Sequence, residues 1–465
     1  MLPEAFKSRM KGLLGSEHEA FISELECGAE IKGVRINPVK CDPKKFPDAW
    51  EGALEPIPYF HLGFIPDRTT GLGSTAAHHA GMIYVQDPGA MAALSALDIE
   101  EGWWVLDMCA SPGGKATQAA GAIGKDGFLF ANEFVPKRAK TIVSNIERLG
   151  IPNAIVTSLD TKELPKMFSE VFDLVICDAP CSGEGMFRKS CPAIEQWSTE
   201  NVTECAKRQI SILSNAPTLV KEGGYLLYST CTYSVEENEG VVDAFLAENP
   251  EFELVEVKAS LRDSTADGAF FDGAKSPDLH LTRRFYPHRS RGEGQFVALM
   301  KKTESYGKKQ GILYKNAGKS PSKEEYLIVQ KFFSENLVCA PEADLIKHQD
   351  KLVLINSDVA IPEHSVFSAG VLLGEIRKGV LHPHHQFFSA YGSLMKRRES
   401  LTLSDPRLAA YIRGEEIEAK SFSDAGYCAV MLCDAPIGGG KASGGIIKNH
   451  YPKGLRADIT RCAEE

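Results

Sequence analysis

The sequence predicts an α/β fold built on a doubly wound, mostly parallel sheet. Between residues 100 and 250, short apolar segments alternate regularly with longer amphipathic segments. Such alternation is typical of strand–helix–strand units whose strands lie parallel in one sheet. The chain has 465 residues, which is longer than one ordinary domain, so we expect further modules on both sides of this sheet.

The elements of the central sheet follow from the same alternation. The expected strands are short and apolar, at residues 103–106, 127–131, 154–157, 172–177 and 225–229. The expected helices fill the intervals and carry their apolar residues on one face, at 115–123, 136–149, 199–219 and 235–249. A further strand at residues 295–302 is expected to close one edge of the sheet.

The regions that flank the sheet predict smaller modules. Residues 1–75 combine two amphipathic helical patterns with a strand-like run and predict an N-terminal α+β segment, followed by a central domain at 76–303. After a linker, the sequence Ser-Lys-Glu-Glu at 322–325 is a capping box that begins a helix. Short strands beyond it predict an α+β module at 304–378 and a last module at 379–465.

Composition and charge restrict the classes of function. The formal net charge of −10 disfavours an indiscriminate polyanion binder, although basic groups at 283–291 and 396–398 are candidates for local positive surface. The 12 cysteines and 12 histidines show no zinc-ligand spacing, so no metal site is predicted. There is no secretory signal and no apolar run of 18 residues. We therefore expect a cytoplasmic protein that does not bind a membrane.

A small-residue loop follows the first strand of the sheet. Asp107 ends that strand, Pro112, Gly113 and Gly114 lie in the loop, and Lys115 begins a helix. Glycines allow the backbone to approach a ligand closely, and a helix N-terminus favours an anionic group. The spacing matches neither GxGxxG nor GxxxxGK[ST], so neither a dinucleotide site nor a P-loop is predicted.

Acidic residues also follow the next three strands. Glu133 follows the second strand, where a carboxylate can accept hydrogen bonds from ribose hydroxyls. Asp160 follows the third strand, in a position suited to an exocyclic amine, and Asp178 follows the fourth. Because the carboxyl ends of parallel strands meet at one edge, we expect these carboxylates and Asp107 to converge on one crevice.

Two cysteines lie in polar turns at the same edge. Cys181 follows Pro180 in the turn after the fourth strand, and Cys231 follows Thr230 after the fifth. A thiol with an ordinary pKa of about 8.5 needs activation to attack near neutral pH. A helix N-terminus or the neighbouring Lys115 is a candidate for that role.

Together these motifs resemble the Sun-domain (Fmu-like) RNA cytosine-C5 methyltransferases, which use S-adenosylmethionine. The resemblance rests on the following pieces: DMCASPGGK at 107–115, Glu133, Asp160, DAPCSGEG at 178–185 and YSTCTYSVEENE at 228–239. GVRINPVK at 33–40 and MIYVQDPGAM at 82–91 resemble the family's N-terminal segment. The ending KNHYPKGLR at 448–456 resembles the bacterial 16S ribosomal RNA branch, which carries PUA-like C-terminal modules.

The resemblance implies a Rossmann-like S-adenosylmethionine-dependent catalytic domain with defined residue roles. Cys231 would add to cytosine C6, which makes C5 nucleophilic enough to accept a methyl group. Cys181 would assist release of the adduct, and Asp178 would hydrogen-bond the cytosine edge beside the cofactor. The implied S-adenosylmethionine pocket comprises Cys109, Ala110, Ser111, Pro112, Gly113, Gly114, Lys115, Glu133, Arg138, Asp160 and Asp178.

The partner implied by the resemblance is RNA, most directly 16S ribosomal RNA or the small ribosomal subunit. A cytosine in structured RNA must leave its stack to reach the crevice. To reconcile RNA binding with the acidic net charge, we expect positive surface from the N-terminal segment, from residues 283–291 and from the PUA-like module. Arg35 is a candidate phosphate contact, with a surface arginine that binds nothing as the alternative. We expect a monomer.

Other functions are compatible with parts of the sequence. One is a non-catalytic RNA-binding ribosome assembly factor on the same fold, and another is cytosine-C5 methylation of a different RNA such as tRNA. Methylation of DNA cytosine is disfavoured, because those enzymes attack through the cysteine after proline and do not need Thr230 and Cys231. A metal-dependent hydrolase is disfavoured by the missing ligand spacing.

Overall fold

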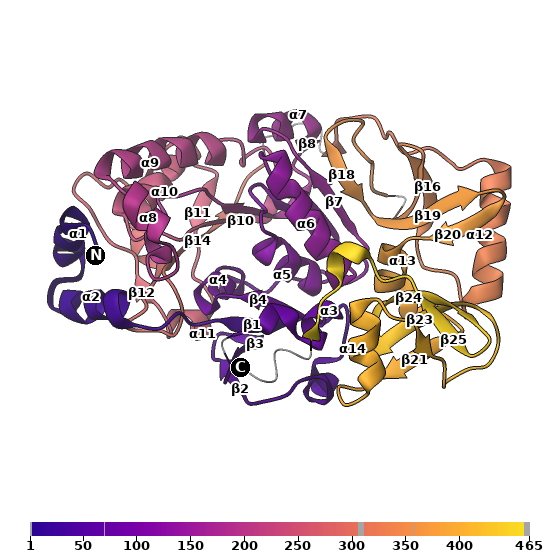
Figure 1. Cartoon of the computed structure of the whole chain (residues 1–465). Helices are drawn as coiled ribbons and strands as arrows, with labels where there is room; N and C mark the ends of the chain where they lie inside the picture. The colour runs from indigo at the N-terminus through magenta and orange to yellow at the C-terminus, as the bar shows by residue number, and fades with distance from the viewer. Residues whose placement is uncertain (1, 69, 306–310, 357, 460–465) are drawn as a thin grey trace.

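The computed structural model describes residues 2–68, 70–305, 311–356 and 358–459. Its centre is a ten-stranded mixed sheet of order β12-β13-β14-β10-β9-β5-β6-β7-β18, with β11 also paired to β14 (Figure 1). The strands of this sheet are β5 (Trp104–Asp107), β6 (Phe128–Asn132), β7 (Ala154–Thr157), β9 (Phe172–Asp178), β10 (Val220–Thr230), β11 (Phe252–Leu254), β12 (Ala266–Asp267), β13 (Arg283–Phe285), β14 (Gln295–Lys302) and β18 (Val366–Ala369).

The five strands at the centre of the sheet are parallel, which confirms the predicted doubly wound fold. β10, β9, β5, β6 and β7 run side by side in the same direction. Helices α5 (Gly114–Ala122) and α6 (Pro136–Leu149) connect β5, β6 and β7, and α9 (Thr199–Leu213) precedes β10, which α10 (Glu239–Glu248) follows. The direction of winding reverses between β5 and β9, and ligands bind at the carboxyl ends of strands at such a switch point.

Three details of this sheet differ from the prediction. β14 does not close an edge, because β13 pairs with its free side. The opposite edge is extended by β18, a strand from the C-terminal part of the chain that pairs antiparallel with β7. Helix α9 ends at Leu213 rather than at residue 219, because Pro217 cannot continue a helix.

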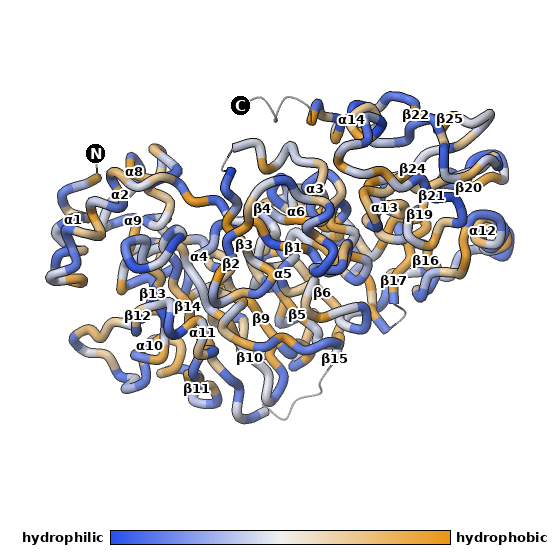
Figure 2. The backbone as a smooth tube through the Cα atoms, turned by 90° about the horizontal axis from the view of Figure 1, so that it is seen from below, coloured by the Kyte–Doolittle hydropathy of each residue, from blue (hydrophilic) through white to orange (hydrophobic). Residues whose placement is uncertain are grey.

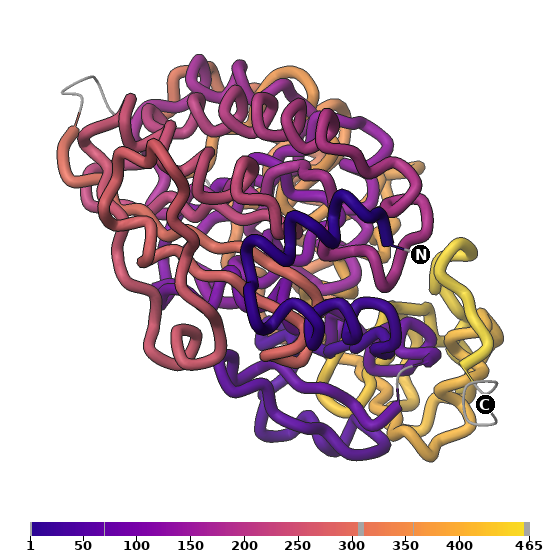
Figure 3. Tube along the Cα trace, turned by 90° about the vertical axis from the view of Figure 1, so that its left-hand side faces the viewer, coloured from indigo at the N-terminus to yellow at the C-terminus, as the bar shows by residue number. Residues whose placement is uncertain are grey.

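The N-terminal part of the chain has two pieces. Helices α1 (Glu4–Leu14) and α2 (His18–Cys27) pack against loops on one side of the central sheet (Figure 3). A separate antiparallel sheet of order β2-β3-β1-β4 follows. Its strands and the short helices beside them are β1 (Gly33–Ile36), β2 (Leu54–Ile57), β3 (Phe60–Pro66), α3 (Ala76–His79), β4 (Ile83–Gln86) and α4 (Pro88–Ala92).

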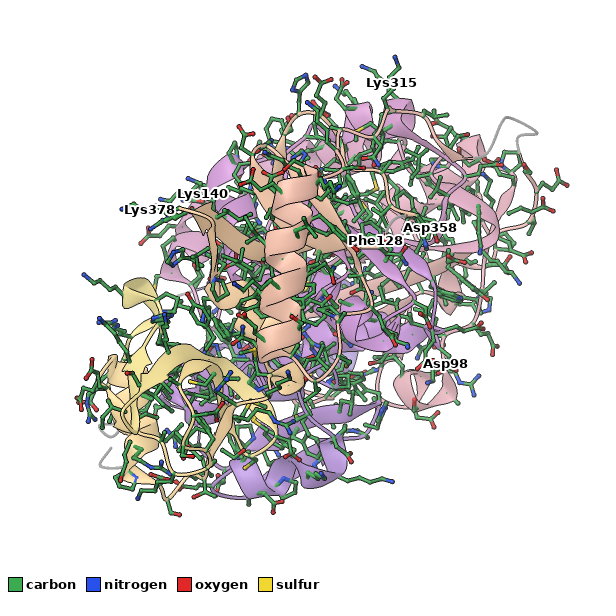
Figure 4. The ribbon with its side chains drawn as sticks, turned by 90° about the vertical axis from the view of Figure 1, so that its right-hand side faces the viewer. Asp98, Phe128, Lys140, Lys315, Asp358 and Lys378 are labelled. Carbon is green, nitrogen blue, oxygen red and sulfur yellow. The ribbon has the colours of Figure 1, made fainter. Side chains whose placement is uncertain are left out.

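The C-terminal part contains two smaller sheets of orders β16-β17-β19-β20 and β21-β23-β24-β25-β22. Helix α12 (Lys323–Asn336) begins at the predicted capping box, and it stands in front of these strands in Figure 4. The remaining elements here are β16 (Asp344–His348), β17 (Lys351–Ile355), β19 (Val371–Arg377), β20 (Val380–Pro383), α13 (His385–Tyr391), β21 (Arg398–Leu401), α14 (Pro406–Arg413), β22 (Ile417–Glu418), β23 (Gly426–Leu432), β24 (Ala435–Ser443) and β25 (Ile446–Asn449).

The N-terminal sheet and the last sheet share one hydrophobic core. Val34 and Ile36 of β1 pack in the same cluster as Tyr411 of α14 and Val430 of β23. The apolar residues of the central strands form the interior of the molecule (Figure 2). No helix among the described residues is both long and apolar enough to cross a membrane.

Candidate active site

The structure places the glycine loop at the switch point between β5 and β9. Asp107 ends β5, and Gly113 caps α5 with a φ of 113°, a left-handed conformation that suits glycine. The first amide groups of α5 have no partner within the helix and are free to meet a ligand. The loop therefore presents backbone donors next to the carboxyl ends of two central strands.

Three carboxylates surround this loop. Burial, with Asp178 nearby, raises the pKa of Asp107 to about 8, and Glu133 adds to the same effect. Glu133 is itself buried and accepts a hydrogen bond from the amide of Val135 at 2.9 Å. Its second oxygen lies 3.6 Å from the guanidinium of Arg138. The structure thus brings Asp107, Glu133 and Asp178 close together at the carboxyl ends of the central strands.

Asp160 and Arg138 lie in more exposed positions. Asp160 caps the short helix Thr161–Glu163 by accepting a hydrogen bond from the amide of Lys162 at 3.0 Å. The guanidinium of Arg138 donates to the carbonyl oxygen of Ser111 at 3.2 Å. Arg138 therefore joins the start of α6 to the glycine loop and fixes the loop from outside.

Asp178 is oriented by two neighbours. Its Oδ2 lies 2.8 Å from Nζ of Lys115, and its Oδ1 accepts a hydrogen bond from Oγ of Ser229 at 2.7 Å. About a third of the Asp178 side chain is exposed, so a ligand can reach part of it. Lys115 thus pairs with Asp178. The sequence also offered Lys115 as the group that activates a cysteine, and this pairing gives that role no support.

The two cysteines of the turns meet in space. Sγ of Cys181 lies 3.2 Å from Sγ of Cys231, and both are free thiols. The hydrogen bond to Cys231, together with burial, holds the pKa of Cys181 well above its usual range. Either sulfur can be the donor in this contact.

A buried glutamate that sequence reasoning missed holds the Cys231 loop in place. Glu184 is fully buried, three residues after Cys181. Its four hydrogen-bond donors are the hydroxyls of Thr232 (2.8 Å) and Ser234 (2.6 Å), the amide of Tyr233 (2.8 Å) and the indole N–H of Trp197 (2.8 Å). Glu184, on the loop that contains Cys181, is thereby hydrogen-bonded to three successive residues of the loop that contains Cys231.

A second buried glutamate, Glu237, makes the reciprocal connection. It belongs to the Cys231 loop and accepts hydrogen bonds from the amide of Ser182 at 2.9 Å and from Gln209 at 2.8 Å. The amide of Gly185 donates to the carbonyl oxygen of Cys231 at 2.8 Å, an approach that a Cβ at Gly185 would obstruct. In the sequence both glutamates lie inside the quoted motifs at 178–185 and 228–239, but nothing there shows that they are buried.

The titration of Glu237 is expected to appear in the pH dependence of stability. Burial raises the pKa of Glu237 from 4.5 to about 7. Between these values the folded state binds more protons than the unfolded state, so this group makes stability fall as pH rises. For Glu237→Gln we expect the decrease in unfolding free energy between about pH 5 and about pH 8 to shrink by roughly 2–3 kcal/mol relative to wild type. Urea unfolding at both pH values measures it, and an unchanged decrease would contradict the assignment.

The arginines that the sequence suggested for RNA binding interact instead with other residues of the protein. Arg35 is buried, with hydrogen bonds to Thr117 at 2.8 Å and Gln86 at 3.1 Å, so it joins β1 to α5 inside the protein. Burial lowers the pKa of Arg35 to about 10. The expectation of a phosphate contact or an unpaired surface arginine at Arg35 is wrong.

The arginines at 283–291 are neutralised by acidic residues of the same chain. Each of its four arginines pairs with a carboxylate: Arg283 with Asp267, Arg284 with Glu239, Arg289 with Glu17 and Arg291 with Glu55. Two of them, Arg283 and Arg284, are buried in β13. The expected positive surface at this segment is wrong, because distant parts of the chain supply the matching acids.

Relatives matched along the whole chain determine the family. The ribosomal RNA small subunit methyltransferase F of Erwinia tasmaniensis is 31% identical over 489 residues, which cover 98% of this chain and 97% of that protein. The chain belongs to this methyltransferase family. A protein of the same name from Vibrio vulnificus is 31% identical over 477 residues, with 98% of both chains covered.

Family models match three parts of the methyltransferase. Residues 94–301 match the 16S rRNA methyltransferase RsmB/F model. Residues 2–88 match the N-terminal domain of 16S rRNA methyltransferase RsmF, and residues 398–457 match the methyltransferase RsmF PUA domain. The predicted PUA-like module at the C-terminal end of the chain is confirmed.

Solved structures support the catalytic fold. A methyltransferase homologue from Pyrococcus horikoshii superposes with a TM-score of 0.55 at 26% identity, covering 64% of this chain and 95% of that one. NSun6 from the same organism, solved with SFG, has a TM-score of 0.54 at 20% identity, covering 65% of this chain and 99% of that chain. SFG is an analogue of S-adenosylmethionine, the cofactor of this fold.

The residues at this edge of the sheet fit S-adenosylmethionine in their chemistry. The amides at the start of α5 suit a carboxylate, and the carboxylates of Glu133 and Asp107 suit hydroxyl or amino groups. When bound, the cofactor supplies an electrophilic methyl group on a cationic sulfur. The carboxylate of Asp178, which is partly exposed, favours a positive charge at this place. Among the described residues no cluster of His, Cys, Asp and Glu could hold a metal ion.

Proposed function

We propose that this methyltransferase methylates C5 of a cytosine in 16S ribosomal RNA through a covalent bond between Cys231 and C6. The observation that carries the proposal is the pair of sulfurs 3.2 Å apart beside Asp178 at the switch-point crevice. A thiol that donates to a second sulfur stabilises the thiolate form of the acceptor, which is the nucleophile. The resemblance of the motifs assigns attack to Cys231, the cysteine after Thr230, and release to Cys181, the cysteine after Pro180.

The reaction balances with the residues at hand. The Cys231 thiolate forms a bond to C6, and the C5=C6 electron pair moves to C5. C5 would then take the methyl group from the cofactor's sulfonium sulfur, which keeps the bonding pair and leaves as a neutral thioether. Asp178, oriented by Lys115 and Ser229, hydrogen-bonds the cytosine edge and favours protonation at N3. The C5 proton then passes to water, and its bonding pair re-forms the C5=C6 bond. The S–C6 bond breaks in the same step, and its pair returns to Cys231. The Cys181 thiol stabilises that departing thiolate by the hydrogen bond seen between the sulfurs.

The finer assignments form part of the same proposal. Residues Cys109–Lys115, Glu133, Arg138 and Asp160 bind the cofactor. Residues 76–303 carry the chemistry, while residues 1–75, 304–378 and 379–465 position the RNA. One chain supplies every group in the mechanism, so a monomer suffices. The free thiols that it requires persist in a reducing cytoplasm.

Transfer of labelled methyl groups tests this function. Full-length protein with labelled S-adenosylmethionine is expected to label 16S ribosomal RNA, naked or in small subunits, and the product after digestion is 5-methylcytidine. Transfer RNA and DNA are the comparison substrates and are expected to remain unlabelled. Binding of cofactor without transfer to any RNA would contradict the proposal and favour a non-catalytic assembly factor.

A further inference from the structure

Helices α1 and α2 form a hairpin that packs against both loops that carry the thiols. These loops are residues 179–189, the Cys181 loop, and residues 231–238, the Cys231 loop. One hydrophobic cluster joins the hairpin to both loops and to residues near them: Leu2, Phe6, Met10, Phe21, Ile22, Leu25, Phe187, Trp197, Val202, Tyr233 and Tyr286. The hairpin therefore shares its core with the two segments on which the chemistry depends.

Phe6 of α1 lies at the centre of these contacts. Its side chain is fully buried, and its ring centre lies 5.0 Å from that of Phe187 and 5.8 Å from that of Trp197. Both pairs are edge-to-face, which is a favourable arrangement for aromatic rings. The ring of Tyr233, two residues after Cys231, lies 6.5 Å away. A single side chain of the hairpin thus contacts a ring on each loop.

Trp197 connects Phe6 to the carboxylate that holds the Cys231 loop. The indole N–H donates to Glu184 at 2.8 Å, and Glu184 also accepts hydrogen bonds from residues 232–234. Because protein interiors are close-packed, removal of the Phe6 ring would leave the indole without a neighbour on one side. The indole would then no longer hold Glu184 in one orientation, and the Cys231 loop would lose part of its support.

Each helix of the hairpin also forms an ion pair with one of the loops. Arg9 of α1 pairs with Glu236 on the Cys231 loop. Glu24 of α2 lies 2.7 Å from Arg188 on the Cys181 loop, and Glu293 lies 2.9 Å from the same guanidinium, whose side chain is 1% exposed. A buried charge needs such partners, because an unpaired one is strongly destabilising. The two loops are therefore fixed to the same hairpin at two further points.

The hairpin is separate from the part of the sheet assigned to the cofactor. Among the described residues, its hydrophobic cluster contains none from β5, β6, β9 or β10. Ala110 and Ala116, at the glycine loop and the start of α5, belong to a different cluster. A change in the core of the hairpin should therefore disturb the thiols while the cofactor-binding residues keep their arrangement.

We propose that Phe6 is a positioning residue for the thiol pair, acting through Trp197 and Glu184 to hold the Cys231 loop in its reactive arrangement. The proposal rests on the proposed function, since it concerns the attack of Cys231 on C6. The sulfurs of Cys231 and Cys181 lie 3.2 Å apart only while both loops keep their places. The hairpin thus acts on the chemical step, in addition to any share that the N-terminal segment has in holding RNA.

The kinetics of Phe6→Ala in the full-length protein test this role. At saturating RNA and cofactor, kcat is expected to fall about 10- to 100-fold, since misplacement of a reacting group by about 1 Å can cost about 10²-fold in rate. The Kd for S-adenosylmethionine and the KM for 16S ribosomal RNA are expected to stay within about 3-fold of wild type. Phe6→Leu keeps most of the apolar volume and is expected to restore kcat to within about 3-fold.

The rate of adduct formation isolates the attack itself. In a Cys181→Ala background the adduct is expected to accumulate, so the rate at which the protein–RNA band appears reports attack by Cys231. Adding Phe6→Ala to this background is expected to slow the band by the same factor as kcat. A band that forms at the rate of the Cys181→Ala protein would overturn the proposal.

Phe168 provides a matched control for loss of a buried ring. It is fully buried beside Phe172, which begins β9, whereas the Cys181 loop follows the other end of that strand. Folded Phe168→Ala is expected to keep the kcat of wild type. An equal fall of kcat in Phe168→Ala and Phe6→Ala would indicate general destabilisation and would overturn the proposal.

Trp197→Phe tests the same path without creating a large cavity. It keeps an aromatic ring next to Phe6 but removes the N–H that donates to Glu184, so kcat is expected to fall about 10-fold. Wild-type kcat in folded Trp197→Phe would overturn the proposal, whether or not Phe6→Ala folds. Wild-type protein that binds cofactor but transfers no methyl group refutes the proposed function, whereas an active wild type with unaffected variants refutes the positioning role alone.

Discussion

Replacing Cys231 by alanine is expected to abolish methyl transfer, whereas replacing Cys181 is expected to leave the protein covalently attached to RNA. Without the Cys231 sulfur no bond to C6 can form, so the rate should fall on the order of 10⁴-fold or more. Without the Cys181 thiol the adduct still forms, but the departing thiolate loses its hydrogen bond. We expect release to slow by about 10²–10³-fold, as for the loss of one stabilising donor. A denaturing gel with labelled cofactor measures both effects.

Cys205 offers a matched control for these variants. It is a buried free cysteine on α9, outside both catalytic turns. Cys205→Ala is expected to transfer methyl groups like wild type and to give no slowly migrating protein–RNA band. A band that appears with Cys231→Ala, and not with Cys181→Ala, would reverse the roles of the two thiols.

Replacing Glu184 by alanine is expected to cause the largest loss of stability among changes near the site. The change leaves four buried donors without their acceptor, from Thr232, Tyr233, Ser234 and Trp197. Each unsatisfied buried group costs about 1–3 kcal/mol, and relaxation shares part of the cost, so we expect about 3–5 kcal/mol of unfolding free energy to be lost. Chemical denaturation of the full chain measures this value.

The control for Glu184 is an exposed glutamate of the same domain. Glu204 is an exposed residue of α9 whose carboxylate forms a salt bridge with Lys207. Glu204→Ala is expected to change the free energy of unfolding by less than about 0.5 kcal/mol. Glu184→Gln keeps the size of the side chain and one acceptor oxygen, so it should retain more stability than alanine. It should still transfer methyl groups more slowly than wild type, because the Cys231 loop loses part of its support. Full activity in folded Glu184→Gln would contradict a positioning role.

Elements with clear boundary signals were predictable from sequence. Helix α6 has the predicted bounds because Pro136 begins it and Gly150 ends it, in the left-handed conformation that glycine favours. Strand β7 also has its predicted bounds. The position of β14 was not predictable, because an apolar pattern reveals a strand but not which strands lie beside it. For the same reason nothing local indicated that β18 would extend the catalytic sheet.

The candidate site was predictable at the level of strand ends. Parallel strands carry Asp107, Glu133 and Asp178 to one edge, and the structure brings these side chains together there. The polar supports behind the thiols required three-dimensional information, since Glu184 and Glu237 are bonded across two separate loops. The arginines were misjudged because their partners are distant in sequence, as with Glu17 and Arg289. A run of basic residues shows charge, but burial and pairing decide whether that charge is available.

The most direct test of the covalent mechanism identifies the sulfur that carries the base. The Cys181→Ala protein is incubated with S-adenosylmethionine and 16S ribosomal RNA, digested with nuclease and protease, and analysed by mass spectrometry. The predicted result is a methylated cytidine nucleotide on the peptide that contains Cys231. A nucleotide on any other cysteine, or active protein with no nucleotide on any peptide, would contradict the mechanism.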